Sequence, residues 1–454
     1  MNKTVKWILI VVILAVIAVG IILWVRQLSA EQAADYQYVT IWKADVLSLI
    51  DDSSNLKLDF ERASDRVKMA RRGFERGFAA NPGAEVFTES VIPDDWNSQI
   101  NAETIADIFS SEDILLTVGA TTDETTMNTS MEMNFFNIPM LIPFADGNLS
   151  PDDSPVNYSI RMTPTAQKYA EYFNEIFSSG YFSLINNVFF QDARIPEYDI
   201  NVAVFFTDNF NGHNTAVNIT QKIMDNGYNV EIYAPYTSLA DLQYAINSSW
   251  QTEPERMKSV DSIVIIGEDG ASMRGMAAIN QAWKDYGLEP LIFLVGFLPN
   301  GIEEEVLNVR NVYAIHQSLD FDNCPADIVN RSEAMGYAAG YIVSSALIEA
   351  QKRQEDAPSG LRLLFASPDR RNEMHQDYLT SYRENLRSVL LEMDEMIPCY
   401  GMVDFDVNSD SNISLELVYY TGPDQPELVR SSILLDYMID KVEREFNLQP
   451  TGGN

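Results

Sequence analysis

The sequence predicts an α/β protein with largely parallel sheets, preceded by one amino-terminal transmembrane helix. Short apolar strands alternate with helices along most of the chain, and several of these helices stop at a glycine. Strands that alternate with helices are typical of βαβ units, in which neighbouring strands run parallel. The length of 454 residues is enough for two or three domains. An uncharged apolar run near the amino terminus predicts the membrane helix.

The apolar run covers residues 7–25 and is flanked by Trp7 and Trp24. A helix of this length spans about 28 Å, close to the hydrocarbon thickness of a bilayer. Lys3 and Lys6 precede the run, so the positive-inside rule leaves the amino terminus in the cytoplasm. We therefore expect a protein anchored in the cell membrane, with its main part periplasmic or extracellular. The alternative is a cleaved signal peptide, whose apolar core is usually shorter.

The composition is that of a folded, strongly acidic protein. Hydrophobic residues make up 46% of the chain, which supplies packed cores and argues against global disorder. The formal net charge of −35 repels a phosphate backbone, so nucleic acid is not an expected partner. Two cysteines and three histidines argue against a disulfide-built scaffold and a zinc site, and we expect no cofactor. Cys324 and Cys399 are either bonded to each other or buried as free thiols.

The first part of the exported chain alternates strands and helices closely. Residues 45–50 are expected to form the first strand, and residues 60–80 a helix with apolar residues near one face. Further strands are expected at residues 86–91, 114–118 and 138–143. Further helices are expected at residues 102–109 and 165–177. Gly119 ends the strand at 114–118 and opens a loop.

The same alternation continues in the second part. Strands are expected at residues 201–206, 230–233, 262–266 and 291–295. Helices are expected at residues 215–226 and 273–286. Each of these helices is followed by a glycine, Gly227 or Gly287, as is common just beyond a helix end.

Two later segments have more than one interpretation. Residues 334–350 are apolar enough to be weighed as a second membrane span, but Glu349 and many small residues favour a buried helix. Residues 426–446 carry an apolar stripe typical of an amphipathic helix. We expect that helix to pack on the body of the protein, and dimerisation is the alternative.

Six short motifs follow one another between residues 45 and 422. They are ILLTVGATTDETTMN at 114–128, NIPMLIP at 137–143, YSIRMTP at 158–164, VAVFFTDNFNG at 202–212, SIVIIG at 262–267 and GMVDFD at 401–406. Each motif is short, but their order and spacing resemble the branched-chain amino-acid (leucine/isoleucine/valine) binding proteins of ABC importers. That family has the type I periplasmic binding fold.

The resemblance implies two doubly wound lobes joined by a hinge, with a ligand cleft at the carboxyl ends of the strands. It divides the chain into a membrane segment at 1–30, lobe 1 at 36–164 and 314–398, lobe 2 at 165–313 and 399–425, and a terminal helix and tail at 426–454. It further implies a non-enzymatic protein that captures a small polar solute, such as an amino acid or an amide, for ABC permease subunits.

The resemblance also places the ligand-binding residues in loops at the cleft. They are Thr121, Thr122, Asp123, Phe144, Ala145 and Asp146 in lobe 1, and Phe210, Asn211, Glu268 and Asp269 in lobe 2. The family's contacts to an amino acid are not matched residue by residue, since Ala166 stands near the family's acidic residue for the ammonium. The acids instead suit a cationic or polyhydroxylated ligand between apolar walls of phenylalanine. The alternative is that these acids belong to a generally acidic surface.

Three further interpretations bear on function. Proteins of this fold also serve as sensing or partner-binding ectodomains, and the amino-terminal tether favours that alternative. His213 either reaches the cleft or is an ordinary histidine. Residues 406–411 resemble the start of a calcium loop, but Ser411 and Leu417 stand where such a loop needs glycine and glutamate, which favours a turn at a strand end. No catalytic motif is evident.

Overall fold

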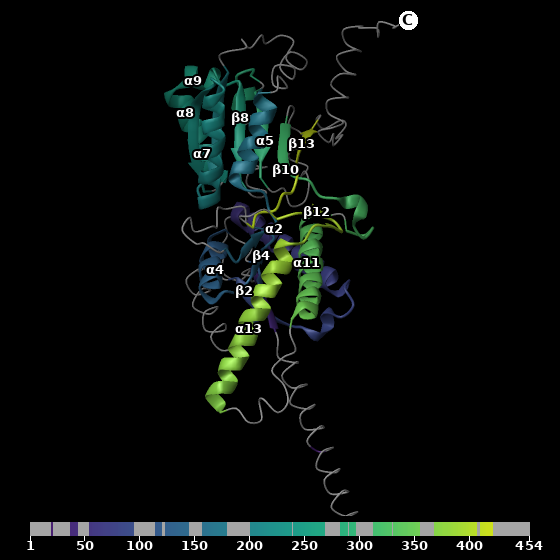
Figure 1. The fold of residues 1–454 in the computed structure, drawn as a ribbon. Coiled ribbons are helices and arrows are strands. Elements are labelled where there is room, and N and C mark those ends of the chain that lie inside the picture. The colour runs from purple at the N-terminus through teal and green to yellow at the C-terminus, as the bar shows by residue number, and fades with distance from the viewer. Residues whose placement is uncertain are drawn as a thin grey trace, which may run out of the picture.

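The structure is a computed structural model of the chain. It describes residues 20, 37–43, 54–94, 114–119, 123–144, 157–178, 200–237, 239–267, 282–288, 290–296, 312–328, 330–354, 367–405 and 409–420. The described elements form two α/β lobes, each built on its own sheet (Figure 1).

The first lobe contains a five-stranded sheet with the strand order β2-β1-β3-β4-β5. The strands are β1 (Gln37–Lys43), β2 (Thr88–Asp94), β3 (Ile114–Val118), β4 (Met140–Ile142) and β5 (Ser159–Arg161). All neighbouring pairs are parallel. Every residue of β3 and β4 is buried, which explains why these strands read as continuous apolar runs.

The main helices of the first lobe are α2 (Ser54–Ala79), α4 (Asp123–Phe136), α11 (Arg331–Arg353) and α13 (Pro368–Leu391). Helices α2 and α11 approach so closely that glycine is required at their contact. A Cβ atom on Gly336 would lie 1.9 Å from the carbonyl oxygen of Ala70, and one on Gly73 would lie 2.0 Å from that of Glu333. The segment weighed as a second membrane span is therefore a buried helix of the first lobe, because α11 contributes many residues to its core.

The second lobe contains a six-stranded sheet with the strand order β13-β10-β9-β8-β6-β7. The strands are β6 (Asn201–Thr207), β7 (Asn229–Tyr236), β8 (Ser262–Ile266), β9 (Leu291–Val295), β10 (Val312–Gln317) and β13 (Leu415–Tyr420). β13 runs antiparallel to β10, and the other pairs are parallel. The helices are α5 (Ala166–Ser178), α7 (Phe210–Asp225), α8 (Leu239–Thr252) and α9 (Pro254–Lys258).

Apolar clusters cover both faces of the second sheet. Alternate residues of β6 enter different clusters: Val204 and Phe206 belong to one, and Ala203 and Phe205 belong to the other. Successive side chains of a strand point to opposite faces, so the second sheet is buried on both sides. This is the doubly wound arrangement that the sequence predicts.

Three crossover segments join the lobes. Residues 162–165 lead from β5 to α5, residues 318–330 lead from β10 to α11, and residues 404–414 lead back to β13. The end of β5, just before the first crossover, is paired with the third, since the Arg161 amide donates to the Ser409 carbonyl at 2.9 Å. The second and third are paired as well, because the Ser318 amide donates to the Ser414 carbonyl at 2.8 Å.

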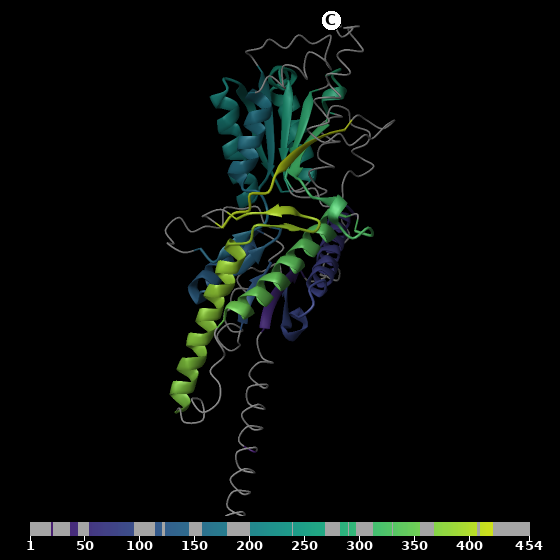
Figure 2. The ribbon, with the colours of Figure 1, turned by 45° about the vertical axis from the view of Figure 1, so that its right-hand side comes forward.

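A small hairpin, β11 (Glu395–Ile397) and β12 (Gly401–Val403), lies between the lobes beside these crossovers and is drawn in yellow-green in Figure 2. The Tyr400 hydroxyl in its turn donates to the Met162 carbonyl at 2.5 Å. Burial raises the pKa of Tyr400 far above its usual range, so this hydroxyl stays neutral and remains a donor. The turn also carries a disulfide between Cys399 and Cys324 of the second crossover, which decides between the two interpretations of these cysteines.

Most expected elements coincide with observed ones. The strands expected at 114–118, 262–266 and 291–295 match β3, β8 and β9. The first strand among the described residues is β1, at Gln37–Lys43. The expected strand at 45–50, the helices at 102–109 and 426–446, and most of the helix at 273–286 lie outside the described residues.

Two expected lobe boundaries differ from the crossovers of the observed fold. The boundary between residues 398 and 399 falls in the turn of the β11–β12 hairpin, before the third crossover. The boundary between residues 313 and 314 falls inside β10, all of which pairs with β13 in the second sheet. The chain therefore leaves the second lobe only after Gln317. The boundary expected between residues 164 and 165 falls within the first crossover.

None of the helices in the described part of the chain is long and apolar enough to cross a membrane. The apolar run at residues 7–25 lies outside the described residues, apart from Gly20.

Candidate functional site

The carboxyl ends of the parallel strands in both lobes face the region between the lobes. β5 passes directly into the crossover to the second lobe, and β10 passes directly into the crossover to the first. Because the strands beside them are parallel, those strands end on the same sides. Helices α4 and α7 follow β3 and β6, so both begin in the interlobe region, and the two helices contact each other. Ligands of open α/β sheets bind at such carboxyl ends.

Three of the expected binding residues stand at the starts of these helices. Asp123 is the first residue of α4, and Phe210 and Asn211 are the first two of α7. Phe144 follows β4 directly, but its side chain is only 3% exposed and belongs to the core of the first lobe. Its role as an apolar wall stays a prediction.

The other six expected binding residues lie outside the described part of the chain. They are Thr121, Thr122, Ala145, Asp146, Glu268 and Asp269. Each follows closely on a strand, β3, β4 or β8, whose carboxyl end faces the other lobe. Their contribution to a ligand site stays a prediction.

The start of α7 is built by its own sequence. Asn209 caps the helix, and its side-chain oxygen accepts a hydrogen bond from the Gly212 amide at 2.7 Å. Gly212 lies so close to the preceding turn that a Cβ atom there would be 2.1 Å from the Thr207 carbonyl oxygen. The remaining amides of the first turn and the helix dipole favour an anionic group at this position.

A hydrogen-bonded pair of Asp208 and His213 lies beside this helix start. The His213 Nε2 atom is 2.7 Å from the Asp208 carboxylate, and both side chains are about half exposed, at 48% and 47%. The His213 ring packs edge-on against Phe206, with 4.8 Å between ring centroids. His213 is therefore a fixed side chain in the first turn of α7. Asp208 was not among the binding residues expected from the sequence. It lies directly after a strand and five residues before a histidine, and this spacing could have indicated it.

A metal centre is not indicated in the described residues, which hold no group of three or more histidine, cysteine, aspartate or glutamate side chains suited to an ion. In the described residues, the candidate site consists of two helix starts and an Asp–His pair between two lobes.

Three solved structures with a similar overall fold are described as binding proteins. The leucine-binding protein LivK of Thermotoga maritima matches with a TM-score of 0.58 and 13% identity, over 86% of this chain and 96% of its own. LivJ of Streptococcus pneumoniae, solved with isoleucine, matches with a TM-score of 0.51 and 13% identity, over 87% and 99%. An ABC-transporter solute-binding protein of R. palustris, solved with benzoate, matches with a TM-score of 0.56 and 11% identity, over 88% and 95%.

No protein-family model matches the sequence, and neither does any curated protein. At these identities the structural likeness establishes the fold, which is the type I periplasmic binding fold that the sequence resembles. Each of these three matching structures is itself a leucine-, substrate- or solute-binding protein.

Proposed function

We propose that this chain is a solute-binding protein that holds a small polar molecule between its two lobes. The observation that carries the proposal is the contact between α4 and α7, two helices that begin between two sheets whose carboxyl ends face each other. The first turn of a helix carries backbone amides without acceptors inside the helix, and such amides can donate to a ligand. The molecules bound in the matching structures, isoleucine and benzoate, both carry a carboxylate.

The ligand that fits these groups is an amino acid, an amide or a related solute. Helix starts favour a carboxylate or another electron-rich group, and His213 is a further donor or acceptor beside them. Asp208, Asp123 and the acids expected at 146, 268 and 269 favour an ammonium or hydroxyl groups on the same ligand.

We further propose that the protein works outside the cytoplasm, anchored by residues 7–25, and presents its ligand to an ABC permease. The Cys324–Cys399 disulfide supports this location, because disulfides persist in oxidising compartments and are rare in the cytoplasm. The permease would distinguish the ligand-closed arrangement of the lobes from open ones, since a ligand shifts the equilibrium toward the state that it binds better.

The test is a thermal-shift screen of the full chain against amino acids, amides, polyamines, sugars, nucleosides and aromatic carboxylates. A ligand at 100 times its Kd should stabilise the folded state by about 2.7 kcal/mol, which gives a clear rise in Tm. The double variant D208N/H213Q should keep the fold and weaken binding of the hit about tenfold or more, because it alters the polar groups beside the start of α7.

The matched control is E231Q, which breaks an exposed ion pair with Arg256 near the amino end of β7, away from the interlobe ends of the strands. This variant should bind like the parent. A well-folded parent with no shift across the whole panel would contradict solute binding and favour a partner-binding ectodomain.

A further inference from the structure

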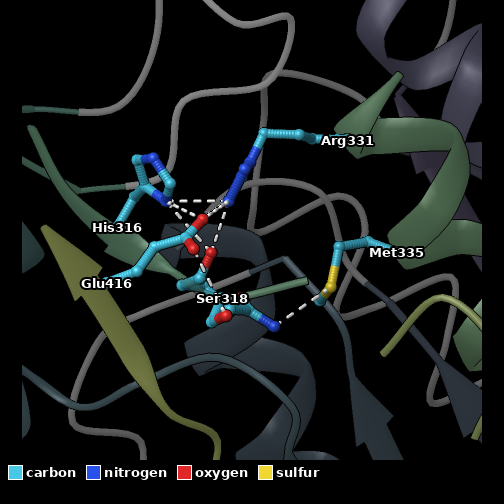
Figure 3. Close-up of polar contacts among 6 residues, drawn as sticks. His316, Ser318, Arg331, Met335 and Glu416 are labelled. Atoms are coloured by element: carbon cyan, nitrogen blue, oxygen red, sulfur yellow. Dashed lines mark hydrogen bonds and ion pairs between the residues drawn. The ribbon is translucent and has the colours of Figure 1, made fainter. Parts of the chain in front are cut away.

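A buried polar cluster joins the two lobes at the second crossover. It consists of His316 and Gln317 at the end of β10, Ser318 just beyond them, Glu416 on β13, and Arg331 at the start of α11. The side chains of His316, Arg331 and Glu416 point toward one another from these three elements (Figure 3). We refer to these five residues as the interlobe cluster.

Arg331 is at the centre of the interlobe cluster. Its Nη2 atom lies 2.7 Å from His316 Nδ1 and 3.2 Å from Glu416 Oε1. The same atom donates to the Gln317 carbonyl at 2.5 Å. The side chains of Arg331, Glu416 and His316 are only 12%, 9% and 4% exposed, so water screens these contacts weakly. Hydrogen bonds between charged groups are stronger than neutral ones in such surroundings.

The three partners of Arg331 named above belong to the second lobe. His316 and Glu416 are directly opposite each other in the antiparallel pair of β10 and β13. Ser318 extends this side of the cluster, because its hydroxyl donates to Glu416 Oε2 at 3.4 Å. These groups therefore move with the second sheet.

Arg331 itself belongs to the first lobe. It opens α11, whose start is capped by Asn330 through hydrogen bonds from the Ser332 and Glu333 amides, at 2.8 and 3.2 Å. α11 is held to α2 through the glycine contacts described above, so it moves with the first sheet. A rotation of the lobes about the crossovers consequently separates the Arg331 guanidinium from Glu416 and His316.

We propose that Arg331 is an interlobe latch that sets the equilibrium between the lobe arrangement seen here and more open ones. In the present arrangement α4 and α7 contact each other across the lobes. Opening leaves a buried carboxylate and a guanidinium without their partners, which disfavours the open state strongly. Hinge motions between two packed states depend on such contacts, which are made in one state and broken in the other. The latch requires no ligand, so it stands apart from the proposed function.

The experiment measures the distance between the lobes in the ligand-free full chain. The chain has two cysteines, both in the disulfide, so M131C on α4 and V217C on α7 are the thiols available for spin labels. Both positions are exposed, at 53% and 57%. Pulsed electron double resonance then reports the populations of shorter and longer distances.

In the R331M variant we expect the ratio of the short-distance to the long-distance population to fall about tenfold. E416Q should shift it in the same direction by less. The double variant R331M/E416Q should add little to R331M, because both changes break the same contact. Should R331M fail to fold, R331K retains the charge without the planar fork and should give an intermediate shift.

R383M is the matched control. Arg383 is also buried, and its Nε atom donates to the Ile114 carbonyl at 2.8 Å, entirely within the first lobe. This variant should lower Tm and leave the distance distribution unchanged. If folded R331M, or R331K in its place, gives the distribution of the parent, the interlobe cluster merely stabilises the fold and the proposal is overturned.

Discussion

Asp261 precedes β8, where burial and a backbone hydrogen bond act on one carboxylate in opposite directions. Burial raises the pKa of Asp261, and the hydrogen bond that it accepts from the Asn201 amide at 3.0 Å lowers it by less. The net effect is a raised pKa, so the folded state holds the proton more tightly than the unfolded state. The ionised carboxylate therefore destabilises the fold at neutral pH. This penalty disappears as pH falls through the raised folded-state pKa toward the unfolded one.

The D261N variant should accordingly have a higher Tm than the parent at pH 7. Its side-chain oxygen can still accept the Asn201 hydrogen bond, while no charge is buried. The difference in Tm should shrink as the pH is lowered toward 4, which thermal melts at several pH values would measure. D225N removes a charge from an exposed position at the end of α7 and serves as the control. A difference that is constant with pH would contradict this account of Asp261.

Among the helices and strands, fully buried strands were the easiest to predict from the sequence. β3, β8 and β9 are buried on both faces, so their apolar runs predicted them residue for residue. β10 was missed although all its residues are buried, because His316 and Gln317 interrupt its apolar pattern. α13 is polar overall and was missed too. Its buried stripe of Leu379, Tyr382, Leu386 and Leu390 has helical spacing and could have revealed it.

The candidate site residues stay a prediction, and only four of the ten lie in the described part of the chain. Asp123, Phe210 and Asn211 are at helix starts and Phe144 lies just beyond a strand, positions that chain order alone places on one side of a parallel sheet. The interlobe cluster was not predictable in this way. Arg331 and Glu416 are 85 positions apart in sequence, and only the packing of β13 beside β10 brings them together.

The close contact between α2 and α11 predicts how a glycine substitution there changes stability. In G336A the new methyl group would overlap the backbone at Ala70, so the helices must move apart. Overpacking of this kind costs about 1–3 kcal/mol or more, and we expect a clearly lower denaturation midpoint in urea. K352A, at an exposed position of the same helix, should change the midpoint little. Equal midpoints for G336A and the parent would show that the close approach of the helices is not needed for stability.

On the scale of the whole molecule, the Cys324–Cys399 disulfide links the second crossover to the β11–β12 turn across 75 positions of sequence. A bridge that closes a loop of this size restricts the unfolded chain, and its removal typically costs about 2–4 kcal/mol. The double variant C324A/C399A should therefore unfold at a lower temperature, and reductant should lower the Tm of the parent to a similar value. Reductant should leave the Tm of the double variant unchanged, which controls for other effects of the reagent. In C324A/C399A the hydrogen bonds from the Ser318 and Arg161 amides still connect the segments that join the lobes. The distribution of distances between the lobes should therefore stay that of the parent. A shifted distribution would mean that the disulfide, together with Arg331, determines how the lobes are arranged.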